Sequence, residues 1–171
     1  MNLETGKQKE KKVALFIDHE NICKILQKEK GIWKYDIQAL IDRVKGEGIL
    51  RIAKAYMVTS RNTSEYLYEL SKRGIEPIYT PEDRGKSLGD PMFITDVMEV
   101  LYEMPFIEKF IICTCDKDII PLLKKLALKN KEVLVLGIDS STSEFLINEC
   151  SRLGFKFDGN SFDPAPIKKF E

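Results

Sequence analysis

The sequence has no net charge, because 27 lysines and arginines are balanced by 27 aspartates and glutamates. A neutral chain has no overall field that would draw it onto nucleic acid or an anionic membrane. Any polyanion must therefore be held by a local group of cations. The sequence also has no apolar run close to the roughly 18–20 residues that span a bilayer, so a membrane role has no support.

Cysteine and histidine are scarce. The four cysteines include no CxxC pair and the chain opens on polar and charged residues, so we expect a reduced, cytoplasmic protein. Cys113 and Cys115 have too few potential ligands nearby in the sequence to indicate zinc, and core packing accounts for them better. His19 is the single histidine. It is a conceivable general base, although a site in which a bound metal ion activates the attacking water would not need one.

Internal repeats and low-complexity segments are also absent, and 171 residues fit one domain. The hydrophobic fraction of 43% and the charged fraction of 32% are typical of a globular protein. We expect a flexible tail over residues 1–11, one domain over 12–157, and a tail or surface extension over 158–171.

The apolar pattern alternates between short buried runs and helical stripes, which is typical of an α/β fold with a parallel sheet. The expected strands are 13–18, 49–58, 75–80, 107–115 and 132–138. The expected helices are 21–30, 35–46, 64–73, 91–104, 118–130 and 142–152. Asp90 followed by Pro91 is typical of a helix N-cap with proline in the first turn.

Two of the expected strands end on aspartate. The run VALFID ends on Asp18 and is followed by His-Glu-Asn, while FIICTCDKD runs into Asp116 and Asp118. Because the carboxyl ends of parallel strands meet at one edge of a sheet, these acids should lie near each other. A third acid, Asp96, falls on the flank of the apolar stripe of helix 91–104.

Each acid also has a purely structural interpretation. Asp18 can cap the following helix, Asp90 and Asp116 or Asp118 can cap theirs, and Asp96 can hydrogen-bond a neighbouring loop. Carboxylates gathered at one edge would nevertheless repel each other unless a cation lay among them. Such oxygen ligands suit Mg²⁺ or Mn²⁺, and a phosphodiester would then be cut by a metal-activated water.

A substrate phosphate would need cations near these acids. Arg84 and Lys86, in the segment PEDRGKSLGD, are the best placed in the sequence, and Arg61 is the next candidate. Three tyrosines could stack on unpaired bases, although packing of helix against sheet is the commoner role: Tyr66, Tyr68 and Tyr79.

The segments FIDHEN, GKSLGDPMFITD and CTCDKDIIPLLKKL, followed by EVLVLGI, together resemble the NYN domain family, a branch of the PIN-like nucleases that includes LabA-like proteins. The resemblance covers about residues 12–157. It implies a Rossmann-like three-layer α/β/α fold with about five mostly parallel strands in the order 3-2-1-4-5.

The resemblance further implies a Mg²⁺- or Mn²⁺-dependent endoribonuclease that acts on RNA, most simply single-stranded RNA. Asp18, Asp96 and Asp116 would be the catalytic metal ligands, supported by Asp90 and Asp118. The substrate-binding residues would be Asn21, Arg84, Lys86 and Lys117. A homodimer is compatible with the sequence.

The chain departs from the family pattern in its third motif, where Cys115 replaces glycine and Lys117 replaces a small hydroxyl residue. These departures bring catalytic efficiency into question, and leave open a PIN-like module that binds RNA or a protein partner. Two other enzyme classes also stay open. A toprim-like site would use Asp116, Asp118 and Glu20, and a phosphotransfer enzyme would use an aspartyl nucleophile at Asp18.

Overall fold

A computed structural model describes residues 9–58, 64–84, 86–162 and 164. The main sheet has six parallel strands in the order β3-β2-β1-β6-β7-β8. These strands are β1 (Lys12–Asp18), β2 (Ile49–Met57), β3 (Glu76–Tyr79), β6 (Lys109–Cys113), β7 (Glu132–Leu136) and β8 (Lys156–Asp158). A separate antiparallel hairpin is formed by β4 (Glu82–Asp83) and β5 (Lys86–Ser87).

The α/β fold predicted from the sequence is confirmed, but the predicted strand list needs a correction. The expected order of five strands lacks β8, the sixth strand of the sheet, and the hairpin β4-β5 lies outside it. Strand β8 is only three residues long, and none of them is fully buried. Such a strand has too little apolar pattern to be recognised in a sequence.

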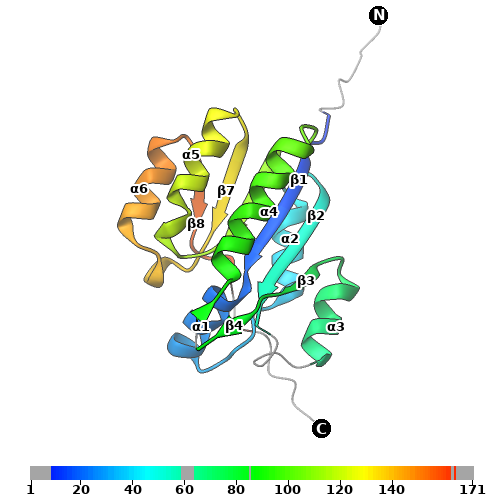
Figure 1. Ribbon diagram of the computed structural model, residues 1–171, viewed down its shortest axis with the longest axis vertical. Helices are drawn as coiled ribbons and strands as arrows, with labels where there is room; N and C mark the ends of the chain where they lie inside the picture. The colour runs from blue at the N-terminus through cyan, green and yellow to red at the C-terminus, as the bar shows by residue number, and fades with distance from the viewer. Residues whose placement is uncertain (1–8, 59–63, 85, 163, 165–171) are drawn as a thin grey trace, which may run out of the picture.

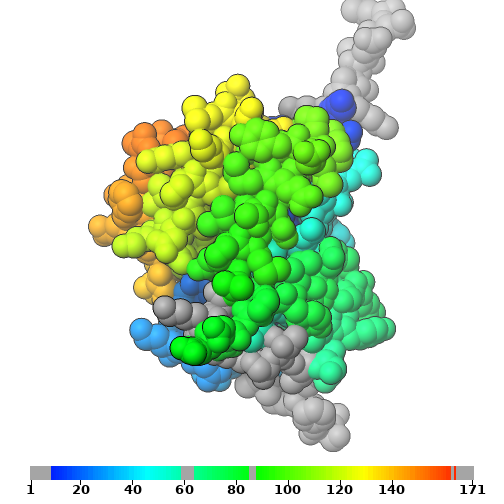
Figure 2. Space-filling model, in the orientation of Figure 1, coloured from blue at the N-terminus to red at the C-terminus, as the bar shows by residue number. Residues whose placement is uncertain are grey.

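Helices cover both faces of the sheet, which gives the three-layer arrangement (Figure 1). One face packs against α1 (His19–Lys30), α2 (Ile37–Lys45) and α3 (Ser64–Lys72). The other packs against α4 (Gly89–Glu103), α5 (Ile120–Leu128) and α6 (Glu144–Arg152). Short 3₁₀ turns, Lys117–Ile119 and Asp139–Ser141, precede α5 and α6. In the space-filling view, α4 crosses the middle of the near face (Figure 2).

Strand β1 lies at the centre of the sheet, between β2 and β6, and its residues Val13 to Ile17 are fully buried. Val13, Leu15 and Ile17 face the core under α1 and α2, whereas Ala14 and Phe16 face the core under α4. A strand covered on both faces needs an unbroken apolar run. The run VALFI therefore fixes β1 in the interior and brings Asp18 out at the carboxyl edge.

The start of α4 differs from the prediction. The sequence indicated Asp90 as the N-cap, but the helix begins at Gly89 and the N-cap position is Leu88, whose side chain cannot accept a hydrogen bond. Asp90 lies inside the first turn, where its carboxylate is not used as a cap. Helix capping therefore does not explain Asp90.

The chain beyond β8 packs back onto the connection between α1 and α2. Phe162 is buried, with its ring 5.4 Å from that of Tyr35, and Pro164 forms an isolated β-bridge with Tyr35. Residues 1–8 and 165–171, which belong to the two expected tails, lie outside the described residues. Within the described part of the chain, every helix is too short or too polar to cross a lipid bilayer.

Candidate active site

A pocket of about 270 Å³ opens at the carboxyl edge of the sheet. Asp18 reaches it from the end of β1, Asp116 from the end of β6 and Asp90 from the first turn of α4. The remaining lining residues are Glu20, Asn21, Lys24, Tyr56, Thr80 and Gly89. Four carboxylates thus surround one small hollow.

Asp18 is partly buried at the end of β1. Its Oδ2 accepts a hydrogen bond from the Thr114 hydroxyl at 3.1 Å, and its Oδ1 accepts one from the Asn21 backbone N–H at 3.4 Å. Burial raises the pKa of the Asp18 carboxyl to about 7, with a further contribution from Asp90 and a smaller one from Asp116. A cation in the pocket would favour the ionised form and oppose this shift.

Asn21 and Thr114 hold the ends of β1 and β6 together. The Asn21 Oδ1 accepts a hydrogen bond from the Cys115 backbone N–H at 2.9 Å, and the Asp116 N–H donates to the Thr114 hydroxyl oxygen at 3.1 Å. The Asp116 Oδ1 in turn accepts the Asp118 N–H at 2.9 Å and caps the following turn. The backbone that carries Asp116 is therefore fixed relative to Asp18.

Cys115, the first departure from the family pattern, points away from the pocket. It is buried, and its Sγ accepts a hydrogen bond from the Ile138 N–H at 3.2 Å, just beyond β7. The added side chain therefore fills the core between β6 and β7 instead of the space between the acids.

Asp90 is close enough to the other acids to be affected by them. Burial raises the pKa of its carboxyl, Asp116 and Asp118 raise it further, and Lys24 acts in the opposite direction. Asp118 itself is exposed and does not line the pocket. Asp118 therefore contributes at longer range than Asp116.

Asp96 does not line the pocket. It lies farther along α4, where its Oδ2 accepts a hydrogen bond from the Tyr56 hydroxyl at 2.7 Å. Tyr56 does line the pocket, and its ring packs on Phe93 with 5.2 Å between centroids. Burial, reinforced by Asp96, raises the pKa of the Tyr56 phenol, so that the hydroxyl stays protonated and donates. Asp96 thus contacts the pocket through Tyr56.

Lys117 and Arg84, two of the cations predicted from the sequence, do not line the pocket. Lys117 is exposed on the turn after Asp116, and Arg84 is exposed at the hairpin turn with a φ of 50°. Arg61 and the side chain of Lys86 lie outside what the structure describes. Lys24 of α1, which the sequence analysis did not single out, does line the pocket.

The two residues after Asp18 separate into different environments. His19 is fully buried and faces away from the acids, with its Nδ1 2.9 Å from the Tyr35 hydroxyl and its Nε2 3.4 Å from the Cys23 Sγ. Glu20 lines the pocket and its Oε1 accepts the Val58 backbone N–H at 2.7 Å. Sequence analysis gave Glu20 little weight, although a carboxylate two residues after Asp18 was a usable signal.

The donor chemistry of the pocket fits a divalent cation. Among the described residues no three acidic, histidine or cysteine side chains already form a compact metal-binding group. Asp18, Asp90 and Asp116 nevertheless supply the carboxylate oxygens that Mg²⁺ and Mn²⁺ prefer, with room for the waters that these ions retain. These three residues are the ones that could hold such an ion.

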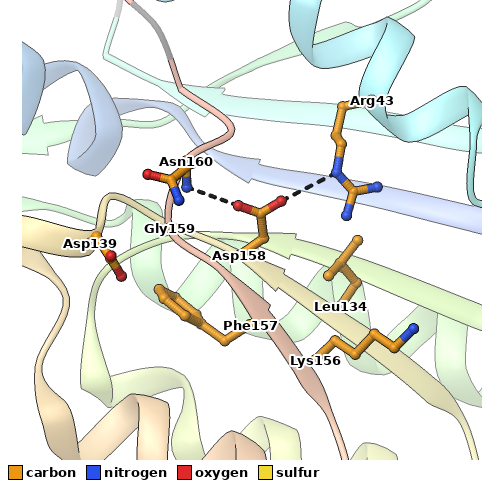
Figure 3. Close-up of a pocket in the computed structure, with 8 residues that line it drawn as sticks. All are labelled: Arg43, Leu134, Asp139, Lys156, Phe157, Asp158, Gly159 and Asn160. Atoms are coloured by element: carbon orange, nitrogen blue, oxygen red, sulfur yellow. Dashed lines mark hydrogen bonds and ion pairs between the residues drawn. The ribbon is translucent and has the colours of Figure 1, made fainter.

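A larger hollow, of about 510 Å³, lies at the β7-β8 edge of the sheet, where Arg43 and Asn160 both bind Asp158 (Figure 3). The Arg43 Nε donates to the Asp158 Oδ2 at 3.3 Å, and the Asn160 N–H donates to the Asp158 Oδ1 at 2.8 Å. Arg43 also pairs with Glu47. These contacts tie β8 to α2, so we assign them a structural role.

Compared with known protein families, residues 12–155 match the NYN domain. The chain belongs to the NYN domain family. NYN domains are PIN-like nucleases and generally use divalent metal ions, so the resemblance inferred from the sequence is confirmed over most of the chain.

A solved structure supports the fold of this NYN domain. The crystal structure of a protein of unknown function from Vibrio parahaemolyticus is 22% identical, with a TM-score of 0.73, over 91% of this chain and 97% of that one. At this identity the likeness concerns the fold alone. The search of curated proteins found no match.

Proposed function

We propose that this NYN domain is a Mg²⁺- or Mn²⁺-dependent endoribonuclease that hydrolyses phosphodiester bonds of single-stranded RNA. The observation that carries the proposal is the meeting of Asp18, Asp90 and Asp116, from three separate elements, in one pocket at the carboxyl edge of the sheet. A protein that only bound RNA would gain nothing from mutually repelling carboxylates beside a polyanion.

In this proposal Asp18, Asp90 and Asp116 hold the divalent ion, and Asp118 adds negative charge nearby. When bound, such an ion supplies a water activated for attack and stabilises the charge on the leaving oxygen. The chain itself contributes orientation. Asn21 and Thr114 fix the two strand ends that carry Asp18 and Asp116. Arg84, Lys86 and Lys117 remain proposed contacts to outer phosphates of the RNA.

We assign Asp96 a positioning role instead of direct metal binding. Its carboxylate accepts the Tyr56 hydroxyl, and the Tyr56 ring forms one wall of the pocket. Asp96 would then act on the site by holding that wall in place.

A purified sample should cut single-stranded RNA when Mn²⁺ is added and should stop when the ion is chelated. Asp18→Asn should lower the rate by about a hundredfold or more, as expected for a group that organises transition-state charge. Asp42→Asn is the matched control, because Asp42 is exposed on α2 and its carboxylate accepts a local hydrogen bond from Gln38, one turn earlier on the same helix. The nuclease proposal fails if no RNA is cut, or if both variants cut as fast as the unmodified protein.

A catalytically silent RNA-binding module is the second candidate. It is favoured by the observation that the described side chains do not form a compact metal-binding group as they stand. Binding of RNA that is unaffected by Mn²⁺ and never followed by cleavage would support this alternative.

A further inference from the structure

Lys24 is the only positively charged side chain among the described residues that line the acidic pocket. It lies on α1, one turn after Asn21, and is exposed. Its charge lowers the pKa of the Asp90 carboxyl against the larger effects of burial and the neighbouring acids. Lys24 is therefore electrostatically coupled to the pocket and also accessible from solvent.

The Lys24 ammonium is not committed to an ion pair with the part of the chain that the structure describes, since none of those carboxylates lies within 4.0 Å of it. Two lysines elsewhere in the chain are engaged. Lys109 pairs with Glu47, and Lys131 donates to the carbonyls of Pro105 and Ile107. The amine of Lys24 thus has its three donors available for a ligand.

We infer that Lys24 binds a backbone phosphate of the RNA substrate at the rim of the pocket. This inference rests on the proposed function and names a substrate contact for it. A neutral chain needs a local cation beside four carboxylates if a polyanion is to approach them. A lysine is suited to this because its flexible ammonium binds phosphate as a point charge.

Helix geometry indicates where the RNA continues. At 100° per residue, Asn21, Lys24 and Lys28 lie within about 60° of one another around α1, whereas Lys30 lies about 120° from Lys24. Lys28 is exposed one turn beyond Lys24. The RNA backbone would therefore leave the pocket along this face of α1, and Lys28 would be a weaker second contact.

The test compares Lys24→Gln and Lys24→Arg with Lys30→Gln, an exposed lysine on another face of the same helix. In Mn²⁺, Lys24→Gln should raise KM for single-stranded RNA about five- to tenfold and leave kcat nearly unchanged, because a rim phosphate is bound equally in the ground and transition states. Lys24→Arg, which keeps the charge, should restore most of the affinity. Lys30→Gln should behave like the unmodified protein.

A second measurement does not depend on cleavage. Binding of a labelled single-stranded oligonucleotide is followed in EDTA at several salt concentrations. Log affinity falls linearly with log salt concentration. Loss of one phosphate contact in Lys24→Gln should make this negative slope shallower by about 0.7. If the unmodified protein cuts RNA but Lys24→Gln keeps both KM and slope, this inference is overturned and the nuclease proposal stands. If the protein neither cuts nor binds RNA, both are overturned. If the protein binds RNA without cutting it, a shallower slope in Lys24→Gln supports the Lys24–phosphate contact, and the nuclease proposal is overturned.

Discussion

At the scale of single residues, Asp18 serves two purposes. One carboxylate oxygen caps α1 and the other accepts the Thr114 hydroxyl, while the side chain also lines the pocket. These contacts stabilise the charge, but burial and Asp90 outweigh them and raise the pKa of Asp18. The sequence left helix capping and metal binding as alternative roles for Asp18. The structure makes the two roles compatible in one side chain.

Asp96 and Tyr56 allow a prediction at the same scale. If Asp96 acts through Tyr56, Asp96→Asn should lower RNA cleavage by no more than about tenfold, the loss expected for one weakened hydrogen bond. Tyr56→Phe should have a similar effect, and the double variant should be little worse than either single one. A loss with Asp96→Asn as large as that with Asp18→Asn, measured by single-turnover cleavage, would make Asp96 a direct ligand instead.

At the scale of elements, the sheet edge is held by contacts between segments far apart in sequence. Asn21 joins α1 to the end of β6, and Glu20 joins α1 to the end of β2. At the opposite, amino edge of the sheet, Glu47 follows α2 and pairs with Arg43 of that helix and with Lys109 of β6. These polar contacts fix how the helices sit on the strands that carry the acids.

The Glu47 cluster should make stability depend on pH in the acid range. Burial works to raise the pKa of the Glu47 carboxyl, but hydrogen bonds from Arg43 and Lys109 outweigh it and leave the pKa below its ordinary value of 4.5. The folded state holds the Glu47 proton less tightly than the unfolded state does. The contribution of Glu47 to stability is therefore complete above about pH 4.5 and is lost as the pH falls through the lowered pKa.

Thermal denaturation of Glu47→Gln at several pH values would measure this contribution. The variant should unfold at a lower temperature than the unmodified protein at pH 7, and the difference should shrink below about pH 4. Glu103→Gln, at an exposed position on α4, is the control. A difference that stays constant between pH 7 and pH 3.5 would contradict the assignment.

At the scale of the whole molecule, the chain end returns to the core. Phe162 is 7% exposed and packs against Tyr35, which in turn contacts His19 and Tyr66. Since His19 is adjacent to Asp18, this aromatic cluster lies directly behind the candidate site. Packing of the end of the chain therefore supports the first turn of α1.

Phe162→Ala should lower the free energy of unfolding by about 3 kcal/mol, a usual cost of removing a buried phenylalanine side chain. Phe145→Ala, at a 59% exposed position on α6, should cost much less. Urea denaturation would compare the two variants. Equal losses would show that Phe162 is not part of the core in solution.

The fold could be predicted from the sequence because its signals are local. Unbroken apolar runs identified β1, β6 and β7, and strand-end aspartates indicated the edge where Asp18 and Asp116 meet. The placement of Asp90 could not be derived in the same way, because it depends on where α4 begins, and the Asp-Pro pair favoured a cap that the helix does not use.

The remaining pocket residues depend on contacts that sequence spacing does not encode. Tyr56 and Thr80 come from β2 and from the end of β3, and they reach the pocket only once the sheet has formed in its observed order. Lys24 was one exposed lysine among many in the sequence. Only the direction of α1 relative to the acids distinguishes it.

Because Asn21 and Lys24 are three residues apart on one helix, α1 fixes the distance between them. The rise of 1.5 Å per residue sets about 4.5 Å along the axis between the residue that braces the two strand ends and the residue proposed to hold the RNA. Neither loop movement nor ion binding needs to adjust that spacing. Inserting a single alanine between them would turn the lysine by about 100° around the helix. The proposed phosphate contact would then leave the face of α1 that carries Asn21, while the acids would keep their positions.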